Sequence, residues 1–196
     1  MVDSEATFEE RIFLWHIATG ILYHTRSTKA KDDHQSLGTS YMSMLLSDYM
    51  GYLLIVQPWI MSKQRGAMIE KCLGIRPTID ELTQNGGIHG YSTQDMQLKR
   101  ICQEICKVQF TGQGQIKSVL QKACILAKKL ESTFPDEDQR WSIIAKVWVE
   151  MLAHASIRCN AISHIHGLSH GGELASIIWL WMAHLGYREN FTEILP

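Results

Sequence analysis

The sequence predicts an all-α protein, a compact bundle of about six or seven helices. Apolar residues recur at intervals of three and four along most of the chain, and strand-like alternation is nearly absent. Hydrophobic residues make up 45% and charged residues 20% of the 196 residues, which is typical of a folded chain rather than a disordered one. Since a domain has roughly 150 residues, we expect a single helical domain over residues 1–196.

The N-terminal part is expected to hold two long helices. The first is predicted over residues 7–24, with acidic residues in its first turn. The second is predicted over residues 37–56 and ends before Pro58, because a residue that precedes proline avoids the helical conformation. Its second half is apolar almost all round, which indicates a buried helix. A flexible linker is expected near residues 25–35.

Shorter elements are expected in the middle of the chain. Residues 66–73 fit a short helix, and Thr78 opens another with a capping box that ends at Glu81. Three glycines then mark a glycine-rich loop near residues 84–92.

Four more helices are predicted after this loop. Two cover residues 93–108 and 116–130, with a glycine-containing break between them. Asp136 opens the third, which carries a long apolar stripe. The last is expected to begin near Ser169 and to end at Gly186, where glycine can adopt a left-handed cap.

Charge and cysteine content exclude several classes of protein. The formal net charge of −1 argues against a nucleic-acid partner and provides no polybasic segment for an anionic membrane. No stretch reaches about 18 consecutive apolar residues, so we expect no membrane insertion by this chain. The acidic N-terminus does not fit a secretory signal, and the five cysteines are odd in number. Free thiols in a cytoplasmic, reducing compartment are therefore expected, with a disulfide framework as the alternative.

A histidine-rich turn is the strongest candidate for chemistry, because thiol and imidazole groups are ligands of zinc. The candidate metal ligands are Cys159, His164, His166 and His170. In a helix, His164 and His166 would point about 200° apart and could not share an ion. In a loop, which Gly167 favours, they could converge. Histidines that cap, stack and donate hydrogen bonds are the alternative, and they imply no cofactor.

The predicted start of the last helix could also bind an anion such as phosphate. Ser169, Gly171 and Gly172 would offer free backbone N–H groups there, although Glu173 competes for the same role. The alternative is a close helix contact that the glycines permit, with Ser169 as the N-cap.

Two further groups of residues could have a role. Cys102 and Cys106 lie four apart on one predicted helix face, as a redox or metal pair would, although buried small side chains are the common arrangement. Trp179 and Trp181 point nearly opposite ways on a helix, so one of them is expected to be exposed or covered by a partner. Packing in the core is the alternative for both tryptophans.

Several segments resemble the plant family called domain of unknown function 594. The residues that carry the resemblance are 14–19, 47–54, 148–152, Cys159, His164, 171–174 and 179–186. The resemblance implies relatives that are numerous in grasses and carry an N-terminal membrane region, so a longer, membrane-anchored parent is one alternative. It implies no known activity. Cys159 and His164 belong to the family pattern whereas His166 and His170 do not, which weakens the metal hypothesis.

We therefore expect a non-enzymatic plant protein-interaction module that binds a protein partner near Trp179 or Trp181. A role in defence or reproductive conflict is an analogy with other expanded grass families. No motif pairs a nucleophile with a base. The alternatives are a small metal-assisted hydrolase or anion-binding enzyme built on the histidine-rich cluster, and a homo-oligomer formed through the C-terminal helices.

Overall fold

A computed structural model gives the structure of the chain. It describes residues 6–26, 34–57, 94–107, 115–169 and 172–186, together with Pro77 and Asp80. Over these ranges the chain forms seven α-helices and no strand, which confirms the predicted all-α bundle. The helix expected over residues 66–73 and the loop near residues 84–92 lie outside the described residues, as do most of the linker and of the helix that Thr78 would open.

The first two helices lie close to their predicted positions. Helix α1 (Phe8–Thr25) begins with a capping box, in which the Thr7 hydroxyl accepts the Glu10 N–H at 3.2 Å and the Glu10 carboxylate accepts the Thr7 N–H at 3.1 Å. Helix α2 (His34–Ile55) begins three residues earlier than predicted and ends one residue earlier. The cap thus sets the start of α1 as the sequence indicated.

The next three helices also agree with the sequence prediction. These are α5 (Gln94–Lys107), α6 (Gln115–Thr133) and α7 (Glu137–Arg158). Helix α7 begins after Asp136 because the carboxylate of this residue accepts the Gln139 N–H at 3.2 Å.

The C-terminal region differs from its prediction. The histidine-rich segment forms a helix, α8 (Ala161–Ser169), and the last helix, α9 (Leu174–His184), begins five residues later than expected. The predicted helix start near Ser169 is therefore wrong, since Ser169 ends α8. The reason lies at Gly167, where an added Cβ would come within 3.1 Å of the Ser176 Oγ atom. Glycine here permits a close contact between two helices and does not break α8.

Left-handed glycines flank α9. Gly172 precedes this helix with a φ of 83°, and Gly186 follows it with a φ of 87°. Only glycine adopts these angles without strain. The left-handed end predicted at Gly186 is thus confirmed.

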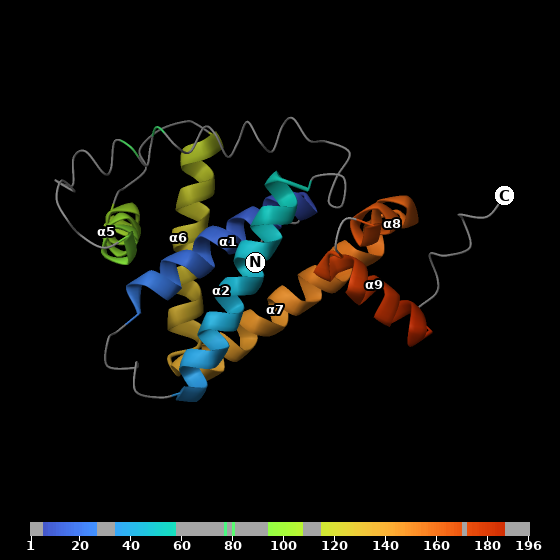
Figure 1. Ribbon diagram of the computed structural model, residues 1–196. Helices are drawn as coiled ribbons and strands as arrows, with labels where there is room; N and C mark the ends of the chain where they lie inside the picture. Colours follow the sequence, from blue (N-terminus) through green and yellow to red (C-terminus); the bar gives the residue numbers. More distant parts are fainter. Residues whose placement is uncertain are drawn as a thin grey trace.

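Helices α1 and α7 connect the parts of the bundle (Figure 1). Helix α1 packs against α2, α5 and α6, whereas α7 packs against α2 and α9, and α8 packs against α9. The pair α8 and α9 lies at one end of the molecule, and α5 and α6 lie toward the other. The end formed by α8 and α9 therefore depends on α7 for its position.

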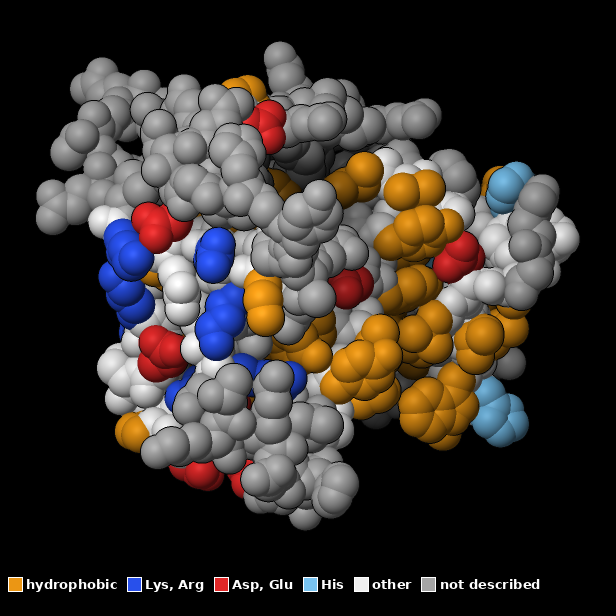
Figure 2. Space-filling model, turned by 60° about the vertical axis from the view of Figure 1, so that its left-hand side comes forward, with side chains coloured by type: hydrophobic (Ala, Val, Ile, Leu, Met, Phe, Trp, Pro, Cys, Tyr) orange, Lys and Arg blue, Asp and Glu red, His pale blue; other side chains and the backbone are white. Residues whose placement is uncertain are grey.

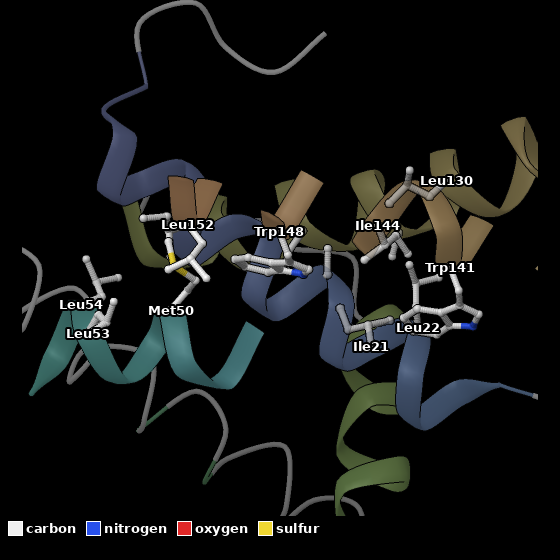
Figure 3. Packing of buried hydrophobic residues seen from close by; sticks show 14 of the residues in the cluster. Ile21, Leu22, Met50, Leu53, Leu54, Leu130, Trp141, Ile144, Trp148 and Leu152 are labelled. Carbon is white, nitrogen blue, oxygen red and sulfur yellow. The ribbon is translucent and has the colours of Figure 1, made fainter. Parts of the chain in front are cut away.

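The main core forms where the apolar face of α7 meets α1 and α2 (Figure 3). The buried residues on this face are Trp141, Ile144, Trp148 and Leu152, and Ile21, Leu22, Met50, Leu53 and Leu54 belong to the same cluster. Each fully buried side chain of this size stabilises the fold by about 1.5–3 kcal/mol. This core is therefore the main source of stability that the described helices share.

A buried hydrogen bond fixes α7 on α1 inside this core. The Trp148 indole N–H donates to the Thr19 Oγ1 atom at 3.1 Å, and both side chains are buried. A buried donor without a partner is destabilising, so this pair favours one alignment of the two helices.

Replacing Thr19 by valine tests this bond, because valine keeps the shape of threonine and removes the acceptor. We expect Thr19→Val to lower the free energy of unfolding by about 1–3 kcal/mol in a urea titration. The matched control is Thr25→Val, since the Thr25 hydroxyl donates only to the Ile21 carbonyl of its own helix, at 2.7 Å. Equal losses in the two variants would contradict a special role for the Trp148 bond.

Candidate functional site

A single buried histidine joins the last three helices. His164 lies on α8 with its Nε2 atom 2.9 Å from the Ser156 carbonyl oxygen of α7 and its Nδ1 atom 3.0 Å from the Ser176 Oγ atom of α9. Because a carbonyl oxygen only accepts, Nε2 carries the proton, and Nδ1 accepts from the Ser176 hydroxyl. The neutral imidazole therefore uses both nitrogens to connect α7, α8 and α9.

The surroundings of His164 favour this neutral form. Burial lowers its pKa below the ordinary value, and the bond to the Ser156 carbonyl only partly opposes the shift. The imidazole also stacks on the Trp179 ring, with centroids 4.6 Å apart and planes 20° from parallel. His164 is thus a structural residue with a fixed ring.

A tyrosine on α2 holds the beginning of α9. The Tyr49 hydroxyl accepts the Ala175 N–H at 3.0 Å and donates to the Glu173 carboxylate at 3.2 Å. Gln57 donates to the other oxygen of the same carboxylate at 3.3 Å. Glu173 is the N-cap residue, but its side chain makes no capping bond, so Tyr49 supplies the acceptor that the end of α9 requires. Burial raises the pKa of Tyr49 above its ordinary range.

The predicted metal ligands are not brought together on one face. Both nitrogens of His164 are engaged, and His166 is exposed about 200° further round α8. Cys159 is buried, and burial raises its pKa to about 11, which keeps the thiol protonated at neutral pH. His170 lies outside the described residues, so the full set of four ligands stays a prediction. Within the described ranges, no group of three His, Cys, Asp or Glu residues could hold a metal ion.

The residues of the predicted anion site lie at the junction of α8 and α9. Ser169 ends α8, and its hydroxyl donates to the His166 carbonyl at 2.8 Å, so it is not the N-cap of α9. The Gly172 N–H donates to the Gly167 carbonyl at 3.1 Å and is therefore already engaged. Gly171 lies outside the described residues. Anion binding at this junction stays a prediction.

Exposed apolar side chains cover the outer side of α8 and α9. We call this the C-terminal apolar surface, and it consists of Ile162, Ile165, Leu168, Leu174, Ile177, Leu180, Trp181 and Leu185. The most exposed members are Ile162 at 75%, Ile165 at 63% and Trp181 at 62%. Figure 2 shows a face on which hydrophobic side chains gather on one side, whereas lysine and arginine side chains lie on the other.

The two tryptophans on α9 lie in different surroundings. Trp181 is exposed, whereas Trp179 is half-buried against His164. This agrees with the expectation that one of the pair faces outward, because side chains two residues apart on a helix point about 200° from each other. Partner binding by either tryptophan stays a prediction.

Sequence reasoning missed the residues that hold this end of the bundle in place. Ser156 and Ser176 are small polar residues on otherwise apolar helix faces, and that placement was the available signal. No comparable signal marked Tyr49, whose partner Glu173 lies 124 residues further along the chain.

Comparison with known proteins places the C-terminal helices in a family. A family model described as "Protein of unknown function, DUF594" matches residues 135–187. These residues form a DUF594 segment. The segment contains α7, α8 and α9. The two hydrogen-bond partners of His164, Ser156 and Ser176, therefore both belong to it. The resemblance found in the sequence is thus confirmed for this part of the chain.

Two other results complete the comparison. No curated protein and no solved structure matches the chain significantly. Among the helices that the structure describes, none is long and apolar enough to cross a membrane. The DUF594 description names no activity.

The neutral imidazole makes the stability of the DUF594 segment dependent on pH. The folded-state pKa of His164 lies below the unfolded value of about 6.5, so the unfolded chain takes up a proton first as the pH falls. The contribution of His164 to the free energy of unfolding is therefore present above about pH 6.5. It is lost as the pH falls toward the folded-state pKa of this residue. His16, whose pKa burial also lowers, acts in the same direction.

Replacing His164 by glutamine tests this dependence. Urea titrations between about pH 5 and 7.5 measure the free energy of unfolding, and His164→Gln should make its slope with pH shallower by up to about 1.4 kcal/mol per pH unit. The exposed His166→Gln serves as the control and should keep a stability near that of the wild type at about pH 7.5. A variant at position 164 with an unchanged slope would show that this imidazole is not the titrating group.

Proposed function

We propose that this chain is a protein-interaction module whose DUF594 segment binds a protein partner through the C-terminal apolar surface. The observation that carries the proposal is the exposed stripe of α9. Leu174, Ile177, Trp181 and Leu185 follow one another at intervals of three and four residues and are all exposed. Such spacing places them on one face of the helix.

Helix α9 carries large apolar residues on its exposed face. A surface helix ordinarily turns its large apolar residues toward the core. In α9 the buried residues are the small Ala175 and Ser176, whereas Ile177 and Trp181 face outward. Contiguous exposed apolar residues of this kind are typical of protein interaction sites.

The charge pattern of the segment supports the same interpretation. From Cys159 to Gly186 the only acidic or basic residue among Asp, Glu, Lys and Arg is Glu173. Its carboxylate is engaged by Tyr49 and Gln57, so it does not stand on the apolar surface as a solubilising charge. The centres of protein interfaces are likewise depleted in charge, and tryptophan is enriched among the residues that contribute most to binding.

The surface is also held in a fixed form. His164 joins α8 and α9 to α7, and Tyr49 joins the start of α9 to α2. Binding to a surface that is already ordered loses less conformational entropy than binding to a flexible segment. These two contacts therefore favour α8 and α9 as a docking platform.

The alternative of a metal-assisted hydrolase or an anion-binding enzyme draws no support from the described contacts. Both nitrogens of His164 serve to join helices, and Ser169 lies at the end of α8. A homo-oligomer remains within the proposal, because a second copy of the chain is also a protein partner.

A double variant tests the proposal. Ile177→Ser with Trp181→Ser places two polar residues in the exposed stripe and replaces no residue of the buried core. We expect it to weaken partner binding by at least about 30-fold, since truncating one dominant interface residue costs about 2 kcal/mol or more. Affinity capture from cells of the source organism, read by quantitative mass spectrometry, identifies the partner, and titration with the purified partner gives the loss.

The control replaces an exposed isoleucine elsewhere. Ile125→Ser on α6, at a residue that is 57% exposed, should keep full binding. Sedimentation of the purified chain separates a second copy from a different protein as the partner. A partner that the double variant retains, with folding confirmed by circular dichroism, would contradict the proposal, as would a wild-type chain that captures no partner and stays monomeric.

A further inference from the structure

Two thiols from neighbouring helices lie against each other. Cys106 on α5 and Cys124 on α6 have their Sγ atoms 3.9 Å apart. The sequence offered Cys102 and Cys106, one turn apart on the same helix, as a candidate redox or metal pair, with buried small side chains as the common arrangement. The structure directs Cys102 elsewhere, since its thiol donates to the Gly20 carbonyl at 4.0 Å. The pair to consider is therefore Cys106 with Cys124.

The two thiols differ in environment. Cys106 is half-buried, and Lys128 donates to its carbonyl oxygen at 3.4 Å, so a positive charge lies beside it. Cys124 is buried, and its thiol lies 3.7 Å from the Ile105 carbonyl. Cys106 is thus the thiol that an oxidant in solution reaches first.

Ionisation follows the same order. In the neutral pair the Cys106 thiol donates to Cys124, and once Cys106 is ionised the Cys124 thiol donates back to the thiolate. This bond and the charge of Lys128 lower the pKa of Cys106, although burial and the negative charge of Glu131 oppose them. The bond and burial raise the pKa of Cys124, and burial raises that of Cys102 to about 12. The thiolate is the reactive form of cysteine.

We propose that Cys106 and Cys124 form an oxidation site for hydrogen peroxide and close to a disulfide that links α5 to α6. The Cys106 thiolate attacks the peroxide, an S–O bond forms as the O–O bond breaks, and hydroxide leaves and takes a proton to become water. The Cys124 sulfur then attacks the resulting sulfenic acid, so that an S–S bond forms, the S–O bond breaks and water leaves with the Cys124 proton. In sum, two thiols are oxidised, one peroxide is reduced and two waters form.

The geometry allows this closure with small movements. A disulfide has a sulfur–sulfur distance of about 2.05 Å, so the two atoms, now 3.9 Å apart, must approach by roughly 1.9 Å. The helices that carry them already pack together, and α1 contacts both. The disulfide would fix α5 to α6 at the end of the bundle away from the C-terminal apolar surface.

The test treats the full chain with hydrogen peroxide, alkylates the remaining thiols and maps the peptides without reduction. Digestion with trypsin and a glutamate-specific protease separates Cys102 from Cys106, because Glu104 lies between them. We expect a linked pair of peptides containing Cys106 and Cys124, with alkylated Cys102 and Cys159. Before alkylation, disulfide formation should lower the mass of the intact chain by two hydrogens.

Three variants assign the steps. Cys124→Ser should stop at a sulfenic acid on Cys106, which dimedone traps, and Cys106→Ser should slow peroxide consumption at least about 10-fold and give no cross-link. Cys102→Ser, one turn away on α5, is the matched control and should keep both the rate and the cross-link. Separate sulfinic acids in the native wild-type chain, a link between Cys102 and Cys106, or thiols that do not react would each overturn the proposal without reliance on any variant.

Discussion

The position of the C-terminal helices depends on one neutral imidazole. Helix α7 ends at Arg158, so the Ser156 carbonyl is among the last carbonyls of the helix, which have no partner within it. His164 donates to this carbonyl and accepts from Ser176, and thereby satisfies an end of α7 while it fixes α9. Burial favours the neutral imidazole, and in this form Nδ1 accepts from Ser176, whereas a protonated imidazole would have to donate to the Ser176 Oγ atom instead.

The pair α8 and α9 has a close inner contact and an apolar outer surface. An added Cβ at Gly167 would come within 3.1 Å of the Ser176 Oγ atom, and Ala175 and Ser176 are the buried residues of α9. Ile178 and Trp179 are half-buried on the same helix, whereas Ile177 and Trp181 are exposed. The contact that holds the two helices together and the surface that we propose for binding therefore lie on different sides of α9.

The sequence predicted those features that depend on a single helix. Apolar spacing, the acidic first turn of α1 and the opening residue Asp136 of α7 located these two helices, because all three signals are local. Helix α8 was missed because glycine has a low helix propensity. In this chain Gly167 lies within a helix, where it permits close contact with Ser176 of α9. The partners of His164 and the pairing of Cys106 with Cys124 depend on how separate helices meet, and periodicity within one helix carries no information on that.

The packing of α7 against α2 has a consequence for how the chain is made. About 80 residues separate the end of α2 from the start of α7, so at synthesis rates of roughly 5–20 residues per second the ribosome adds α7 several seconds after α2. During that interval Met50 and Leu53 lack the tryptophan-rich face that later buries them. The nascent chain thus holds an apolar helix that is only partly covered, by α1, and is open to chaperones until the DUF594 segment emerges.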